Sequence, residues 1–347
     1  MIYELSDREK SILRYVVHQF ILTASPVGSR NLSKKTEIGL SPATIRNIMS
    51  DLEESGLLGH PHTSAGRVPT DLGYRFYVDS LMSPSVLTQK ILRQVNSTFE
   101  AQYNEAEDLV KITSALLSQL TQQLACVTYP KLNKAVLDRI QLIKLSSTRI
   151  LVVVTILSGS VRTITLEMSS RIESRHLQMA EQLFNERLSG LKFEEIKKSF
   201  AERVADYSDK YKPIIRLFLD SVDKIFSNPD KKSEAFLSGA TNVIKNPEFE
   251  NPENLQGIIE LIENKDIIIH LMDQRKKGGG ELSISIGSEN EDEHFEDYSL
   301  ITKEYNMGDL TGTVGIIGPK RMEYSKMVAA ITYVAESLSK EFKNMNF

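Results

Sequence analysis

The chain has little of what a secreted, membrane-spanning or disulfide-bonded protein requires. Its 347 residues include one cysteine, Cys126, and no tryptophan. A single cysteine forms no internal disulfide, and the apolar surroundings QLACVTY are typical of a small core residue. The longest apolar run, ILVVVTIL at 150–157, is too short to span a bilayer, and the charged start MIYELSDREK does not match a secretory signal. We therefore expect a cytoplasmic protein.

The sequence also lacks the patterns of common catalytic and cofactor sites. No phosphate-binding loop, dinucleotide fingerprint, metalloprotease, hydrolase or EF-hand pattern occurs. His60 and His62 have no nearby cysteine, aspartate or glutamate to complete a metal site. The acidic run ENEDEHFED at 289–297 lacks calcium-loop spacing, so we interpret it as a solvated loop, and GGG at 278–280 as a flexible hairpin loop. We therefore expect that the protein is not an enzyme and that it binds no metal ion and no cofactor.

Positive charge is not in excess either. The formal net charge is -4, and residues 1–82 contain nine Lys and Arg against nine Asp and Glu. Bulk basicity therefore does not support nucleic-acid binding, which would depend on where the charges lie. With 347 residues, 41% of them apolar and 25% charged, the chain is expected to fold into several α+β domains.

The segment SPATIRNIMSDLEESG at 41–56 is the most informative part of the chain. It predicts a helix with Ser41 as N-cap, Pro42 at the first helical position and Gly56 as a left-handed stop. At about 100° per residue, Ile45, Met49 and Leu52 share a buried face. The opposite side is small and polar, and Arg, Asn and methyl groups there are suited to base edges in a major groove. Its candidate DNA-contacting residues are Ser41, Ala43, Thr44, Arg46, Asn47 and Ser50. Taken alone, this face fits any soluble helix equally well.

The residues around this helix predict a winged helix-turn-helix. Ser6 and Glu9 form a capping box that starts a first helix, a short second helix is expected at 29–35, and LLGHPHTSAGRVPT at 57–70 predicts a hairpin. A polar hairpin tip can follow a DNA backbone or enter a minor groove. The further candidate DNA-contacting residues are Lys34, Lys35, His62, Thr63, Ser64, Gly66 and Arg67.

The segment 41–82 closely resembles the HrcA family of heat-inducible transcription repressors, and so do GATNVIKNPEF at 239–249 and GPKRMEY at 318–324. PHTSAGRVPT and GYRFYVD make the resemblance specific. It implies a negative regulator of heat-shock transcription: a dimeric repressor that binds an inverted-repeat operator in double-stranded DNA upstream of chaperone genes. It also implies inactivation by heat and reactivation by the chaperonin GroEL. Ile48 departs from the family, whose members usually have an acid there. The residues that match the family's DNA-binding segment are Ser41, Ala43, Thr44, Arg46, Asn47, His62, Thr63, Ser64, Gly66 and Arg67.

Beyond the N-terminal module, helical and strand patterns alternate. After a linker at 83–86, a helix is expected over 87–123, followed by three strands within 136–168 that form half a sheet. The other half is expected at 282–288, 298–305 and 312–319, before a final helix at 323–342. The resemblance implies a GAF-like antiparallel sheet domain with an inserted dimerising domain. The predicted boundaries are 1–82 (winged helix), 83–124 (linker and connecting helix), 125–169 and 256–347 (GAF-like), and 170–255 (inserted).

One helix within the expected insertion is unusually apolar. A small-domain core and a homodimer interface explain it equally well, and the twofold operator implied by the resemblance favours the interface. The candidate dimerisation residues are Tyr207, Tyr211, Ile214, Ile215, Phe218, Leu219, Val222 and Phe226. The alternative function is a small-molecule-responsive transcription regulator that uses the GAF-like domain as effector sensor.

Overall fold

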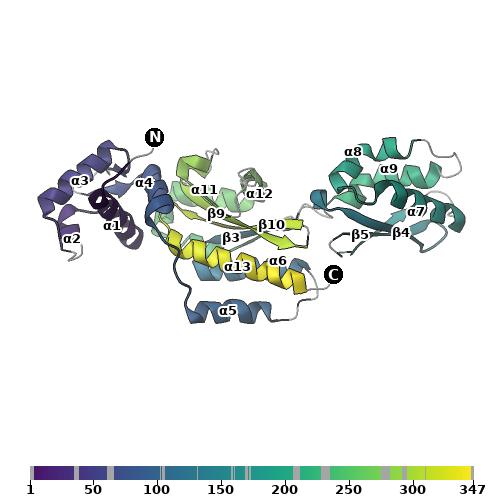
Figure 1. The fold of residues 1–347 in the computed structure, drawn as a ribbon, viewed down its shortest axis with the longest axis horizontal. Coiled ribbons are helices and arrows are strands. Elements are labelled where there is room, and N and C mark those ends of the chain that lie inside the picture. The colour runs from purple at the N-terminus through teal and green to yellow at the C-terminus, as the bar shows by residue number, and fades with distance from the viewer. Residues whose placement is uncertain are drawn as a thin grey trace.

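Three bodies follow one another along the long axis of the molecule (Figure 1). We call them the N-terminal unit (residues 4–81), the central body (residues 89–128 and 235–344) and the insert (residues 132–227). Among the described residues, no helix combines the length and the hydrophobicity of a membrane-spanning segment. The computed structural model describes residues 4–34, 39–60, 66–101, 103, 106–130, 132–157, 159, 161–168, 171, 173–205, 212–227, 235–274, 282–290, 295–308 and 310–344.

The N-terminal unit is built from short helices and a two-stranded antiparallel hairpin. Its elements are α1(Asp7–Thr23), α2(Ser29–Ser33), α3(Pro42–Glu54), β1(Leu58–Gly59), β2(Val68–Pro69), α4(Asp71–Phe76) and the π-helical turn η1(Tyr77–Leu81). The predicted capping box starts α1: the Ser6 hydroxyl and the Ser6 amide each donate to Glu9 Oε2 over 2.7 Å, and these two hydrogen bonds lower the pKa of Glu9. The predicted apolar stripe of α1 packs on α3, which holds the helices together.

A five-stranded antiparallel sheet forms the centre of the molecule, in the order β7-β3-β10-β9-β8. The strands are β3(Leu124–Thr128), β7(Ala235–Ser238), β8(Leu282–Ile286), β9(Tyr298–Met307) and β10(Leu310–Pro319). Alternate residues of β3 enter two different cores: Ala125 and Val127 face one cluster, Leu124 and Cys126 the other. Helices α6(Ala106–Thr121) and α13(Tyr324–Asn344) lie on one side of the sheet, with α11(Pro252–Glu263) and α12(Lys265–Gln274) on the other (Figure 1).

Cys126 lies on an inner strand of this sheet and is fully buried, so its prediction as a core residue is confirmed. Burial raises the pKa of the thiol to about 12, because the thiolate would lose its hydration. The later strands and the final helix are also confirmed close to their predicted positions. The GGG segment at 278–280 lies outside the described residues.

The prediction of a single helix over 87–123 is wrong. The chain forms α5(Gln89–Phe99) and then α6, which contact each other and both pack on α13. Val95 and Phe99 bury the inner face of α5, but the residues that follow, EAQYNEAE, offer little apolar surface for a continuing helix to bury. After folding back, α6 packs against the sheet, and α5 lies against α6 and α13 on the same side (Figure 1).

The three strands expected to complete the central sheet instead form a separate sheet in the insert, so that prediction is wrong. They are β4(Leu137–Lys144), β5(Arg149–Ile156) and β6(Val161–Glu167), in the order β4-β5-β6. One face is buried together with residues of α7(Ser174–Leu188), α8(Phe193–Arg203) and α9(Lys212–Phe226). Side chains of α7 occupy the edge of β4: the amides of Ile140 and Leu142 each donate over 2.8 Å, to Asn185 Oδ1 and Glu181 Oε2.

The insert therefore leaves the central body after β3 and returns at β7, earlier in the chain at both ends than the expected range 170–255. Residues 240–255, which the prediction assigned to the insertion, instead belong to the central body, because Val243 and Phe249 lie in the same buried cluster as Cys126. Ile258, Leu261, Ile268 and Leu271 share a core with Cys126. The remaining short elements are α10(Ala240–Val243) and the 3-10 turns η2(Leu132–Lys134), η5(Pro247–Glu250) and η7(Gly287–Asn290).

Candidate nucleic-acid interface

Helix α3 has the ends that the sequence predicts. The amide of Thr44 donates to the Ser41 hydroxyl over 3.1 Å, and Pro42 occupies the first turn. After the helix, Gly56 adopts a φ of 72°, a left-handed conformation that suits glycine. Local chemistry therefore fixes both ends of α3, and packing against α1 and α2 holds the helix in place.

The two faces of α3 also divide as predicted. Ile45, Met49 and Leu52 are buried, and Ile48 packs on the same core, so its departure from the family pattern extends the apolar face. Four of the predicted contact residues are exposed and two are half-buried. The exposed ones are Ser41, Ala43, Arg46 and Asn47, and the half-buried ones are Thr44 and Ser50.

The charges of α3 are separated along its length. Arg46 lies in the first half, while Asp51, Glu53 and Glu54 lie in the second. Unpaired amides and the helix dipole make the N-terminal end attractive to phosphate. The N-terminal end of α3 is therefore more favourable for a polyanion than its acidic C-terminal end.

The remaining predicted contacts lie partly outside the described residues. Lys34 is exposed at the C-terminal end of α2, which packs directly against α3. Lys35 and the hairpin-tip residues His62, Thr63 and Ser64 are not among the residues described. Their part in DNA binding stays a prediction.

Gly66 and Arg67 sit at the base of the hairpin rather than at its tip. Gly66 is buried, and a Cβ there would lie 2.7 Å from Pro26 Cβ, so glycine permits close packing. Arg67 Nη2 pairs with Glu53 Oε2 over 2.7 Å, and its Nη1 lies 2.7 Å from His60 Nδ1. In this state the guanidinium ties the hairpin to α3. Sequence reasoning missed Glu53 as its partner, because hairpin pairing brings these distant residues together.

The predicted dimerisation residues divide into core and surface positions. Ile214, Ile215, Phe218 and Phe226 are buried inside the insert, where the Phe218 ring packs against that of Phe184 at a centroid distance of 4.4 Å and a tilt of 37°. These four side chains have no free surface for a partner, so their apolar pattern reflects the insert's own core. Leu219 is 37% exposed and Val222 is half-buried. Tyr207 and Tyr211 lie outside the described residues.

The acidic segment 289–297 differs from the solvated loop that was expected. Asn290 is fully buried, and its amide donates to the carbonyls of Gly287, Phe295 and Tyr298. Phe295 is also buried and lies in the same core as Cys126 and Tyr298. Residues 291–294 are not described. In the described part of the chain, no three His, Cys, Asp or Glu side chains cluster in a way that would hold a metal ion.

Comparison with known proteins identifies the family. Residues 107–328 match the sequence model of the HrcA protein C-terminal domain. The chain is 36% identical over 348 residues to the heat-inducible transcription repressor HrcA of Chlorobium phaeobacteroides (strain BS1), covering 98% of this chain and 99% of that protein. It is 38% identical over 342 residues to the repressor of the same name from Acetivibrio thermocellus, covering 98% and 97%. A crystal structure described as that of a hypothetical protein shares the fold, with a TM-score of 0.57, 22% identity and coverage of 98% and 99%. The chain therefore belongs to the HrcA family of heat-inducible transcription repressors.

Proposed function

We propose that the N-terminal unit is a winged helix-turn-helix that reads operator DNA with α3, and that the chain represses chaperone genes. The observation that carries this proposal is the exposed N-terminal half of α3, where Ser41, Ala43, Arg46 and Asn47 are open to solvent. Both helix ends are capped, so this face is preorganised. An arginine and an asparagine on such a face are suited to guanine and adenine edges.

A second copy of the chain would present the same face twice. In this proposal the central body is GAF-like, the insert contributes to dimerisation, and the two α3 helices enter major grooves of an inverted repeat upstream of chaperone genes. Because Ile214, Ile215, Phe218 and Phe226 are used in the insert's core, the dimer contact uses other surfaces, including the side of α9 that carries Leu219 and Val222.

Regulation in this proposal follows the family. The repressor works in the cytoplasm, heat removes the active dimer reversibly, and the chaperonin GroEL restores it. Marginal stability makes such a loss thermodynamically accessible, since the free energy of unfolding of a domain is only about 5 to 15 kcal/mol. Heating the chain and measuring the recovery of operator binding with and without chaperonin tests this part: equal recovery contradicts it.

A pair of single substitutions tests the reading face. We expect Arg46→Ala to weaken operator binding by about 1 to 3 kcal/mol and to reduce the preference over unrelated DNA. Lys34→Ala, the matched control, should weaken binding to all DNA alike and lower the salt dependence. Competition binding at several salt concentrations separates the two. Equal losses of specific and nonspecific binding in Arg46→Ala would reject α3 as the reading element.

Ligand control is a second candidate function, supported by a cavity between the N-terminal unit and the central body. The cavity has a volume of about 610 Å³ and is lined by Phe20, Tyr74, Phe249 and Tyr298 among others. The Tyr74 hydroxyl is buried and has no hydrogen-bond partner among the described residues. Apolar pockets between domains with a few polar groups are typical effector sites. A rise in Tm with a small aromatic compound such as indole, lost in Tyr74→Phe, would support this function, whereas equal shifts in both proteins would contradict it.

A further inference from the structure

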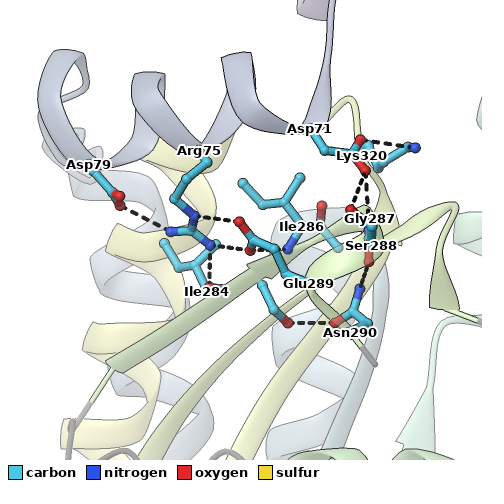
Figure 2. A network of polar contacts seen from close by, with 12 residues as sticks. Asp71, Arg75, Asp79, Ile284, Ile286, Gly287, Ser288, Glu289, Asn290 and Lys320 are labelled. Carbon is cyan, nitrogen blue, oxygen red and sulfur yellow. Dashed lines mark hydrogen bonds and ion pairs between the residues drawn. The ribbon is translucent and has the colours of Figure 1, made fainter. Parts of the chain in front are cut away.

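The N-terminal unit is fastened to the central body by a polar contact that the sequence did not reveal. Figure 2 shows Arg75 of α4 pointing at Glu289, which follows β8 in η7. The guanidinium donates twice to the carboxylate: Nε to Oε1 over 2.8 Å and Nη2 to Oε2 over 2.5 Å. Nη2 also donates to the Ile284 carbonyl over 2.6 Å. We call this contact, together with the contacts of Asp71, Arg321 and Ser85 described below, the seam.

Each partner of the Arg75–Glu289 pair is also held on its own side. Arg75 Nη1 donates to Asp79 Oδ1 one turn further along over 3.0 Å, and Glu289 Oε2 accepts from the Ile286 amide over 2.9 Å. The two charges are therefore oriented before they meet, which favours a bidentate geometry. The carboxylate of Glu289 raises the pKa of Arg75, so the guanidinium stays charged.

A second contact of the seam lies one helical turn before Arg75. The Asp71 carboxylate accepts from the Ser288 amide over 3.1 Å and pairs with Lys320 over 3.0 Å (Figure 2). Gly287 makes room for it: a Cβ at that position would lie 2.1 Å from Asp71 Oδ2, and its φ is 57°. Only glycine combines this backbone conformation with so close an approach.

Contacts on either side extend the seam beyond α4. Arg321 donates to the Ile21 carbonyl near the end of α1 and pairs with Glu248 of the central body. In the linker, the Ser85 hydroxyl lies 2.8 Å from that of Ser325 at the start of α13. The N-terminal unit is thus held at several separated points rather than tethered by a loose linker.

We propose that Arg75 and Asp71 are positioning residues for operator recognition: by docking α4 on the β8–η7 turn, they fix the distance and angle between the two reading helices of a dimer. This inference rests on the proposed function. Two rigidly held reading helices bind most tightly when both half-sites fit at once. The added affinity is lost when the spacing between the half-sites is wrong. A reader on a loose tether would accept many spacings.

The seam predicts a specific separation of effects. The Arg75 side chain is 25% exposed and points from α4 to Glu289 of the central body, which is 33% exposed, while the proposed reading face belongs to α3. Breaking the seam should therefore leave binding to one half-site unchanged and alter only how two half-sites are read together.

The test compares three DNA duplexes: a single half-site, the natural operator, and operators whose spacer is changed by a few base pairs. For the natural chain we expect a preference of about tenfold or more for the natural spacer, since avidity depends on geometry. In Arg75→Ala this preference should fall to about threefold or less, with half-site affinity within about twofold of the natural chain. Arg75→Lys, which keeps one charged contact, should recover part of the preference.

Two further variants keep the inference falsifiable. Gly287→Ala displaces Asp71 without changing any charge and should also flatten the spacer preference. Glu186→Gln removes an exposed charge on α7 of the insert and should leave that preference intact. If both Arg75→Ala and Gly287→Ala keep the spacer preference, the inference is overturned. It is also overturned if both variants lose affinity for a single half-site as much as for the natural operator. If the natural chain binds the operator no better than unrelated DNA, the proposed function fails and the seam inference falls with it.

Discussion

The insert and the seam use opposite kinds of interaction. The core of the insert contains fully buried phenylalanines, with Phe184, Phe200 and Phe218 in mutual ring contact. The seam relies on partly exposed charges and on backbone groups of one tight turn. Apolar burial resists salt, whereas ion pairs near the surface are screened by it.

This difference gives each region a separate role. The insert is a self-contained body at the far end of the molecule from the N-terminal unit (Figure 1), so its stability is set by its own core. The seam joins the N-terminal unit to the central body, so under the proposed function it sets the orientation of α3. Breaking the seam should therefore alter that orientation without unfolding the insert.

The largest effect is expected in the aromatic core of the insert. Phe218→Ala removes a ring that is 0% exposed, so we expect a loss of about 3 to 5 kcal/mol in the free energy of unfolding. Leu219→Ala, at a neighbouring site that is 37% exposed, should cost less than about 1 kcal/mol. Urea unfolding followed by circular dichroism compares the two, and equal losses would show that α9 is not packed as described.

Alkaline pH should distinguish the central body from the phenylalanine core of the insert. Burial raises the pKa of Cys126 to about 12, above its value in the unfolded chain. The stability from this group is therefore complete below about pH 9 and is lost as the pH rises toward 12. Between pH 8 and 10.5 the loss should reach about 2 kcal/mol.

Cys126→Ala should remove that part of the slope. Tyr298, whose pKa burial raises to about 12, contributes in the same direction in both proteins and cancels in the comparison. Unfolding titrations at several pH values measure the difference. An identical slope in the natural chain and the variant would mean that the thiol is accessible in the folded state.

Removing the seam's guanidinium should have a smaller effect on stability. Arg75→Ala leaves Glu289 without its bidentate donor, but both side chains are partly exposed, so we expect a loss of about 1 to 2 kcal/mol. The difference from the natural chain should shrink in high salt. Urea unfolding at low and high salt measures it, and a salt-independent loss would indicate that packing rather than charge holds the seam.

The smallest effect is expected for the exposed ion pair of the insert. Lys197 and Asp223 lie 2.9 Å apart, but Asp223 is 81% exposed. Asp223→Asn should change the free energy of unfolding by less than about 0.5 kcal/mol. Thermal unfolding checks this. A clear drop in Tm would mean that ion pairs stabilise the insert as they stabilise the seam.

Features set by neighbouring residues were predictable from the sequence. The capping box at Ser6, the ends of α3 at Ser41 and Gly56, and the two faces of α3 depend on side chains within a few positions. The candidate reading face could therefore be located in advance, to the level of individual exposed residues.

Pairings between distant residues were not predictable. The three strands within 137–167 alternate like any half-buried strands, so their pattern does not reveal which sheet they join. Arg75 and Glu289 are 214 positions apart, and Glu289 lies in an acidic run that resembles a solvated loop. The buried face of α9 likewise looks the same whether it meets its own domain or a partner.

Footprinting of the full chain on DNA upstream of chaperone genes, across a temperature series, is the decisive experiment for the proposed repressor. We expect two protected half-sites related by twofold symmetry, each covering a major groove, with both lost together on heating. Protection of one site only, or equal protection of unrelated DNA at every temperature, would contradict it.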